Sequence, residues 1–276
     1  LAEQMSWGGV YVLLSGLMLV GILASFLARE PEIREAPPKT LGEAVVLPFK
    51  DFFQRVGPGL GIGVLIFIVL FKYSDALAGS MTTPFLLKTG FTQAEVGLVF
   101  GGAGLLATIG GSIVAGLTIA RIGLNRSMWL FAIFQAFSNL AYYGLALAGR
   151  NHSYMVAAIV FENFGVGLVS SALVAYIMSM CNRRFSATQF ALLSSLVAAS
   201  RDILVAPGGQ IAESMGWPSF FLITVAAGIP CILLLPFIAP WNAEFPTGAV
   251  RRSDDTIGAP ERIGEQGDPG IPSRKG

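Results

Sequence analysis

The sequence predicts an all-α fold, a polytopic membrane helix bundle with about seven transmembrane helices. Of the 276 residues, 54% are hydrophobic and only 13% are charged, and the mean hydropathy is +0.67. Soluble domains carry about 25% charged residues, so this composition is typical of a membrane protein. Apolar runs recur along the chain, each near the ~20 residues that a helix needs to cross the hydrocarbon core. The net charge of +1 gives no reason to expect a nucleic-acid partner.

The apolar runs define the predicted helices. They cover residues 6–27, 59–88, 96–120, 128–148, 154–181, 190–211 and 220–240, with a kink expected at residues 207–209. In the third run Ala107, Gly111 and Ala115 recur every four residues, as do Ser112 and Gly116, a spacing that permits close helix contact.

The polar segments divide the chain into four parts. Residues 1–28 hold the first helix, and residues 29–57 form a polar connector with five Lys or Arg and four prolines. The end of this connector, from Pro48, is predicted to lie at the membrane surface as an amphipathic segment. Residues 58–240 form a six-helix unit, and residues 241–276 read as a disordered tail because they contain no apolar run.

The distribution of basic residues predicts the orientation. Of the 18 Lys and Arg residues, fourteen fall in the connector, in the loops around Arg121 and Arg183, and in the tail, whereas only Lys88 and Arg150 lie in the opposite loops. Basic loops stay in the cytoplasm, so these segments and the C-terminus are expected there. The chain lacks an initiator methionine and a basic leader, and we expect that it begins inside a longer protein.

Ionisable residues inside the predicted spans mark the candidate functional site. A charge at mid-bilayer costs about 2.5–3.5 kcal/mol on insertion scales, so it needs a compensating use. Two cations face three acids, and an acid buried without a cation binds a proton more readily. Alternatively, a missing part of the protein supplies the third cation. The five residues are Lys72, Asp75, Glu162, Arg201 and Asp202.

Lys72 and Asp75 share one helix face with Gly79 and Thr82, which predicts a polar stripe directed toward a cavity. The alternative is a buried Lys72–Asp75 pair that only fixes helix packing. The role of Asp202, adjacent to Arg201, is left open.

Known catalytic motifs are absent from the sequence. The chain has a single histidine, His152, and two cysteines that lie far apart. Neither a catalytic triad nor a metal-ligand spacing is present in the sequence, and the GPGLGIG stretch lacks the third glycine of the dinucleotide fingerprint. We therefore predict a non-enzymatic protein without cofactor or metal.

The segment between the third and fourth helices carries a further signal. Gly116, Arg121, Gly123 and Arg126 resemble the cytoplasmic loop motif of major facilitator superfamily transporters, with Ala120 in the place of the motif's acid. In that family every third helix lines the cavity. If the predicted helices correspond to helices six to twelve, the second and fifth, which carry Lys72, Asp75 and Glu162, are cavity helices.

A closer resemblance is to the AmpG muropeptide permease family. It is carried by FKYSDALAGSMTTPFL (71–86), FENFGVG (161–167) and MCNRRFSATQFALLSSL (180–196) with Arg201, and it covers roughly residues 50–240. The resemblance implies the C-terminal half of a proton-coupled importer of anhydro-muropeptides in the bacterial inner membrane. Its partners would be protons, the bilayer and the N-terminal half of the same transporter.

The resemblance also suggests roles for single residues. Lys72 and Arg201 would bind substrate carboxylates, and Tyr73, Asn163 and Gln189 would hydrogen-bond sugar or peptide groups. Glu162 or Asp75 would carry the proton. Two alternatives remain: a transporter of another anionic solute such as acetyl-CoA, to whose transporters the family is also similar, and a membrane signalling or scaffold protein that does not transport.

Overall fold

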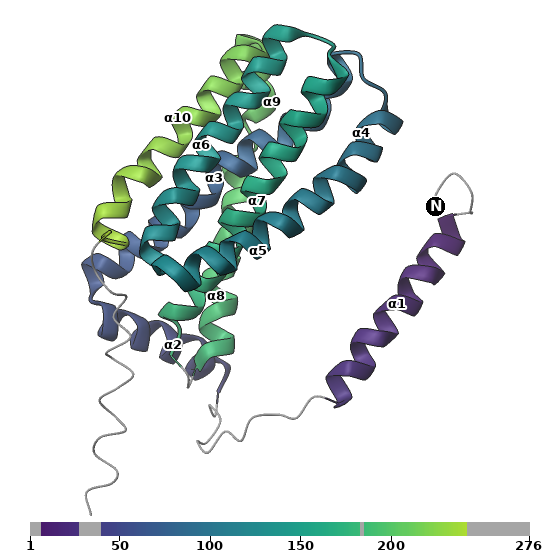
Figure 1. Ribbon diagram of the computed structural model, residues 1–276. Coiled ribbons are helices and arrows are strands. Elements are labelled where there is room, and N and C mark those ends of the chain that lie inside the picture. Colours follow the sequence, from purple (N-terminus) through teal and green to yellow (C-terminus); the bar gives the residue numbers. More distant parts are fainter. Residues whose placement is uncertain (1–6, 28–39, 183–184, 242–276) are drawn as a thin grey trace, which may run out of the picture. The chain divides into compact units, whose positions relative to one another are not determined.

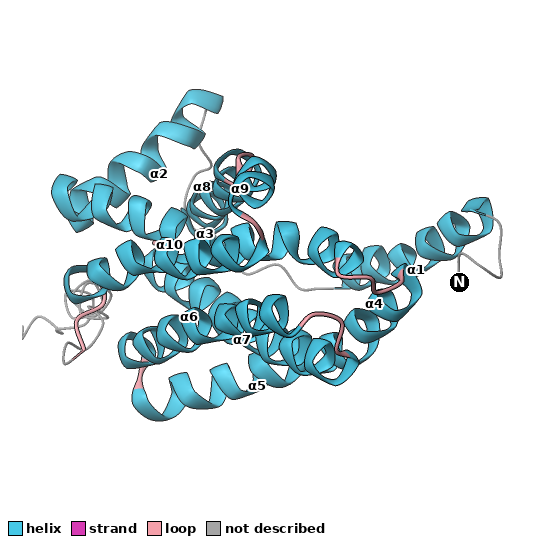
Figure 2. Ribbon diagram, turned by 90° about the horizontal axis from the view of Figure 1, so that it is seen from above, coloured by secondary structure: helices cyan, strands magenta, loops and turns pink. Residues whose placement is uncertain are grey.

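The computed structural model describes residues 7–27, 40–182 and 185–241. Within these ranges all regular structure is helical and no strand is present (Figure 2). Seven helical stretches are long and apolar enough to cross a membrane, which confirms the predicted all-α fold with about seven spans. The predicted tail beyond Trp241, with its basic residues, and Arg183 fall outside the described residues.

The chain separates into two units, residues 1–41 and 42–276. The first unit contains α1 (Trp7–Leu27), an uncharged helix of 21 residues. At 1.5 Å per residue it is about 31 Å long, enough for the hydrocarbon core.

The first helix of the second unit is α2 (Leu41–Val56). It contains the amphipathic segment expected from Pro48 but begins earlier, at Leu41. Next comes α3 (Pro58–Lys88), whose first residue is a proline preceded by Gly57 at φ 86°. A left-handed glycine followed by Pro at the first helical position is a favourable helix start, and it separates α2 from the span.

The third span is one continuous helical stretch with a local irregularity. It consists of α4 (Gln93–Val99), a π-helical turn (Phe100–Gly104) and α5 (Leu105–Ile122). The Thr92 side chain accepts a hydrogen bond from the Glu95 backbone N–H, and the Glu95 carboxylate accepts one from the Thr92 N–H. This capping box satisfies two free donors and begins the helix three residues before the predicted start.

The remaining spans are α6 (Leu124–Ala148), α7 (His152–Met180), a broken sixth span and α10 (Trp217–Ile238). The sixth span comprises α8 (Ser186–Ala199), a π-helical segment (Ser200–Leu204) and α9 (Gly208–Met215). The kink expected at residues 207–209 is confirmed, because α9 restarts at Gly208 after a turn.

Helices α3, α6, α7 and α10 surround two apolar core clusters, one around Phe67, Tyr176 and Leu235 and the other around Phe85, Tyr142 and Phe221. Helix α5 packs along α7 on one side of this group (Figure 1). The close approach expected of the third span is confirmed at Gly111, where a Cβ atom would collide with the carbonyl of Phe164. Gly116, by contrast, faces open space.

Candidate functional site

Four of the five intramembrane charges line one cavity of about 530 Å³, here called the charged cavity. Lys72 and Asp75 come from α3, Glu162 from α7, and Arg201 from the π-helical segment after α8. The other residues that line the cavity are small or apolar: Ala76, Gly79 and Ser80 of α3, and three valines. Charges from the second and fifth spans, the two expected cavity helices, thus meet in one space, and the sixth span adds Arg201. Asp202 is not among the lining residues.

Asp75 is held by two partners. Its Oδ2 forms an ion pair with Lys72 one turn away, and its Oδ1 accepts a hydrogen bond from Gln135 Nε2 at 3.2 Å. The Asp75 residue is only 7% exposed, so both donors compensate for lost hydration. Each carboxylate oxygen of Asp75 therefore has a donor.

Glu162 is equally buried, at 5% exposure, but its partners are neutral. Its Oε2 accepts hydrogen bonds from the Tyr142 hydroxyl at 3.4 Å and from Asn163 Nδ2 at 3.1 Å. Among the described residues no Lys or Arg forms an ion pair with Glu162. A carboxylate buried without a cation favours its protonated form. The two acids of the charged cavity thus differ in their partners, although they share one space.

Arg201 differs from Lys72 in its exposure. Its side chain is 78% exposed, and its Nε lies 4.0 Å from Asp202 Oδ1, a long and exposed contact. Exposed pairs of this kind contribute little. The Arg201 guanidinium at the cavity wall therefore remains able to bind an anion.

The other predicted substrate contacts lie in different places. Asn163 contacts Glu162, and its Oδ1 accepts a hydrogen bond from Thr108 on α5 at 3.4 Å, so it adjoins the charged cavity without lining it. Tyr73 is partly buried against the apolar cluster around Phe85.

Gln189 lies apart from the charged cavity, which corrects its expected position. It is 3% exposed and sits near the start of α8. Its Nε2 donates to the Pro48 carbonyl at 2.8 Å and to Asp51 Oδ2 at 3.0 Å, and its Oε1 accepts from the Asn182 N–H at 2.6 Å. These bonds attach α2 to the α7–α8 turn, and they occupy both ends of the amide.

The loop motif lies between α5 and α6. Gly123 adopts φ 85° and forms the tight connection between these helices, a conformation that favours glycine. Arg126 Nε donates to the Trp241 carbonyl at 3.3 Å, so this turn also holds the end of α10. Arg121 is exposed.

A buried polar stripe on α6 was not predicted from the sequence. Beyond Asn125 and Ser127 near its start, α6 carries four further buried polar side chains: Gln135, Ser138, Asn139 and Tyr142. Their spacing of three, four and seven residues places them on one helix face, and this periodicity is visible in the sequence. Gln135 and Tyr142 contact the two acids directly.

Comparison with known proteins gives consistent results. A model of the Major Facilitator Superfamily matches residues 1–203. An anhydromuropeptide permease of Escherichia coli (strain K12) is 43% identical over 234 residues, which are 84% of this chain and 47% of that protein. A protein of Rickettsia conorii (strain ATCC VR-613 / Malish 7) named "Putative transporter AmpG 4" is 32% identical over 194 residues, 70% of this chain and 46% of its own length. The chain spans about half the length of these curated relatives.

Proposed function

The chain belongs to the Major Facilitator Superfamily, and from this premise we propose that it forms the C-terminal half of a permease for anhydro-muropeptides. The observation that carries the proposal is the charged cavity within a segment 43% identical to an anhydromuropeptide permease. The proposed location is the bacterial inner membrane, with the C-terminus in the cytoplasm as the basic loops predict.

In this proposal substrate binding uses the two cations of the charged cavity. Lys72 and Arg201 line the charged cavity from two different elements, α3 and the π-helical segment, so a ligand in the cavity can reach both. Muropeptides carry peptide carboxylates, which a planar guanidinium can bind through two parallel hydrogen bonds. Asn163 and Tyr73 are proposed to hydrogen-bond the substrate, whereas Gln189 is reassigned to the connector because its amide is already bonded there.

Proton coupling is proposed to depend on the contrast between the acids. Asp75 has a cation and an amide as partners, whereas Glu162 has a hydroxyl and an amide. Glu162 is therefore the better candidate to bind and release a proton during the cycle. Transport itself would proceed by alternating access, in which this half and the other half of the transporter rock around the charged cavity.

The test is uptake by the full-length protein in cells that lack their own muropeptide permease. We expect accumulation of radiolabelled anhydro-muropeptide, unaffected by excess acetyl-CoA. Competition by acetyl-CoA would favour the other anionic solute. Absence of uptake by protein that is correctly inserted in the membrane would exclude this function.

A further inference from the structure

The amide of Gln135 stands between the two helices that carry the acids. Its Nε2 donates to Asp75 Oδ1 on α3 at 3.2 Å, and a Cβ atom at Gly165 of α7 would lie 2.6 Å from its Oε1. Gln135 is 4% exposed, and its Oε1 accepts no hydrogen bond from the described residues. In the described part of the chain the amide therefore bonds only through its donor end, to Asp75.

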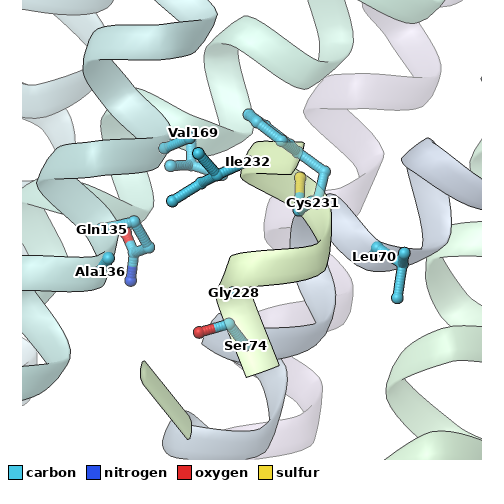
Figure 3. A pocket seen from close by; sticks show the side chains of 10 residues that line it. Leu70, Ser74, Gln135, Ala136, Val169, Gly228, Cys231 and Ile232 are labelled. Carbon is cyan, nitrogen blue, oxygen red and sulfur yellow. The ribbon is translucent and has the colours of Figure 1, made fainter. Parts of the chain in front are cut away.

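The surroundings of Gln135 leave it little freedom. On its other side it borders a small cavity of about 20 Å³ between α3, α6, α7 and α10, with Ser74 and Cys231 in the wall (Figure 3). This space is comparable to one water molecule and is far too small for a saccharide. Helix α7 approaches the amide at a glycine. The side chain is therefore confined where it meets Asp75.

The charged groups around Asp75 come from several elements. On α9 the only charged residue is Glu213, which is exposed, and α8 and α10 contain no charged residue. On α4, Glu95 caps its own helix. The ionisable groups gathered around Asp75 are Lys72 of α3, Tyr142 of α6, Glu162 of α7 and Arg201 of the π-helical segment.

Resting on the proposed function, we propose that Gln135 is a positioning residue: it keeps Asp75 ionised and paired with Lys72, and so leaves Glu162 as the acid that takes up the transported proton. The physical reason is that a hydrogen bond to a carboxylate favours its ionised form. Without the amide donor, Asp75 competes with Glu162 for the proton, and Lys72 loses its partner whenever Asp75 is protonated.

The first test is the pH dependence of uptake by the full-length protein. In Gln135→Leu we expect the acid side of the uptake profile to move to higher pH by about one unit, a tenfold change in proton affinity. Gln135→Glu should behave differently, because the introduced carboxylic acid can donate to Asp75 only when it is protonated. Its uptake should approach the wild-type level at acid pH and fall as the pH rises.

Asn139→Leu is the matched control. Asn139 lies one turn further along α6, is fully buried, and donates to Ser74 Oγ at 3.0 Å instead of to Asp75. If Gln135 only supports helix packing, both leucine variants will lower the amount of folded protein and leave the pH profile unchanged. We expect that outcome for Asn139→Leu alone.

A second readout does not require transport. In the purified full-length protein, the infrared carboxylic acid band that Asp75→Asn removes should appear at higher pH in Gln135→Leu than in the wild type. If this band moves while no variant takes up muropeptide, the proposed function fails and the role of Gln135 stands. If wild-type uptake is present but neither the band nor the profile moves in Gln135→Leu, the inference is overturned.

Discussion

Gln189 and Asp51 are 138 positions apart in the sequence, yet their side chains are joined by a hydrogen bond of 3.0 Å from Nε2 to Oδ2. Asp51 also accepts hydrogen bonds from Arg55 Nε at 2.9 Å and from Asn182 Nδ2 at 3.0 Å. The Asp51 carboxylate of α2 thus contacts Arg55 of the same helix, the α7–α8 turn and the start of α8. These hydrogen bonds hold α2 against the bundle.

We therefore expect Asp51→Ala to loosen α2. Gln189 Nε2 would lose one of its two acceptors and Asn182 Nδ2 would lose its bond to Asp51, at a cost of about 1–3 kcal/mol. The measurement is thermal unfolding of the full-length protein in detergent, together with proteolytic cleavage within residues 41–56. Lys50→Ala is the control, because Lys50 is an exposed residue of the same helix. Equal unfolding temperatures and equal cleavage rates in the two variants would show that Asp51 does not hold α2 against the bundle.

The contact between α5 and α7 gives a second prediction. A Cβ atom at Gly111 would collide with the Phe164 backbone carbonyl, whereas one at the neighbouring Gly110 would meet no atom within 4 Å. We expect Gly111→Ala to destabilise the bundle by about 1–3 kcal/mol, because backbone cannot move aside as a flexible side chain can. Gly110→Ala should be neutral or slightly stabilising, since alanine is the better helix former. Unfolding temperatures that are the same in both variants would contradict the close packing.

The fold could be predicted from the sequence because long apolar runs in a membrane protein have few alternatives to the helix. The start of the third span was placed too late because the apolar pattern does not mark it, although the Thr92-x-x-Glu95 spacing of a capping box is visible in the sequence. The π-helical segments at residues 100–104 and 200–204 were not foreseen, because they depend on packing as well as on composition.

The charged residues of the candidate site could be predicted from the sequence. Lys72, Asp75, Glu162 and Arg201 were identified because a charge in a membrane is costly and therefore informative. Gln135 was missed because an amide adds no charge to an otherwise apolar span. Gln189 was wrongly predicted to contact the substrate, although its position in the span argued against this role. It is the fourth residue of α8, so it lies near the end of its span and far from the middle, where substrate sites are expected.

A third prediction separates the two acids. In the full-length protein, Glu162→Gln should abolish uphill, proton-driven accumulation and leave energy-independent exchange of substrate intact. Asp75→Asn should instead reduce folding or substrate binding, because Lys72 loses its charged partner within the membrane. Both activities can be measured in vesicles with and without an imposed pH gradient. Uphill, pH-dependent uptake by Glu162→Gln would transfer the proton-carrying role to Asp75 or to an acid in the other half of the transporter.

The fourth prediction concerns topology. Single cysteines in place of Arg121 and Ser153, both exposed, should react with an impermeant maleimide from opposite sides of the membrane. The native Cys181 and Cys231 are first replaced by alanine. In intact cells only the Ser153→Cys variant should be labelled, and Arg121→Cys should need permeabilisation. Labelling of both variants in intact cells would be incompatible with the proposed orientation.

The central claim is that the charged cavity binds the anhydro-muropeptide, and substrate protection tests it most directly. Ser80 lines the charged cavity and carries no charge, so a cysteine at this position reports on the space without removing a proposed contact. In the full-length protein without its native cysteines, anhydro-muropeptide should slow the reaction of Ser80→Cys with N-ethylmaleimide several-fold. The same ligand should leave the rate at Ser153→Cys, which lies outside the cavity, unchanged. Equal rates at Ser80→Cys with and without saturating anhydro-muropeptide would contradict the account.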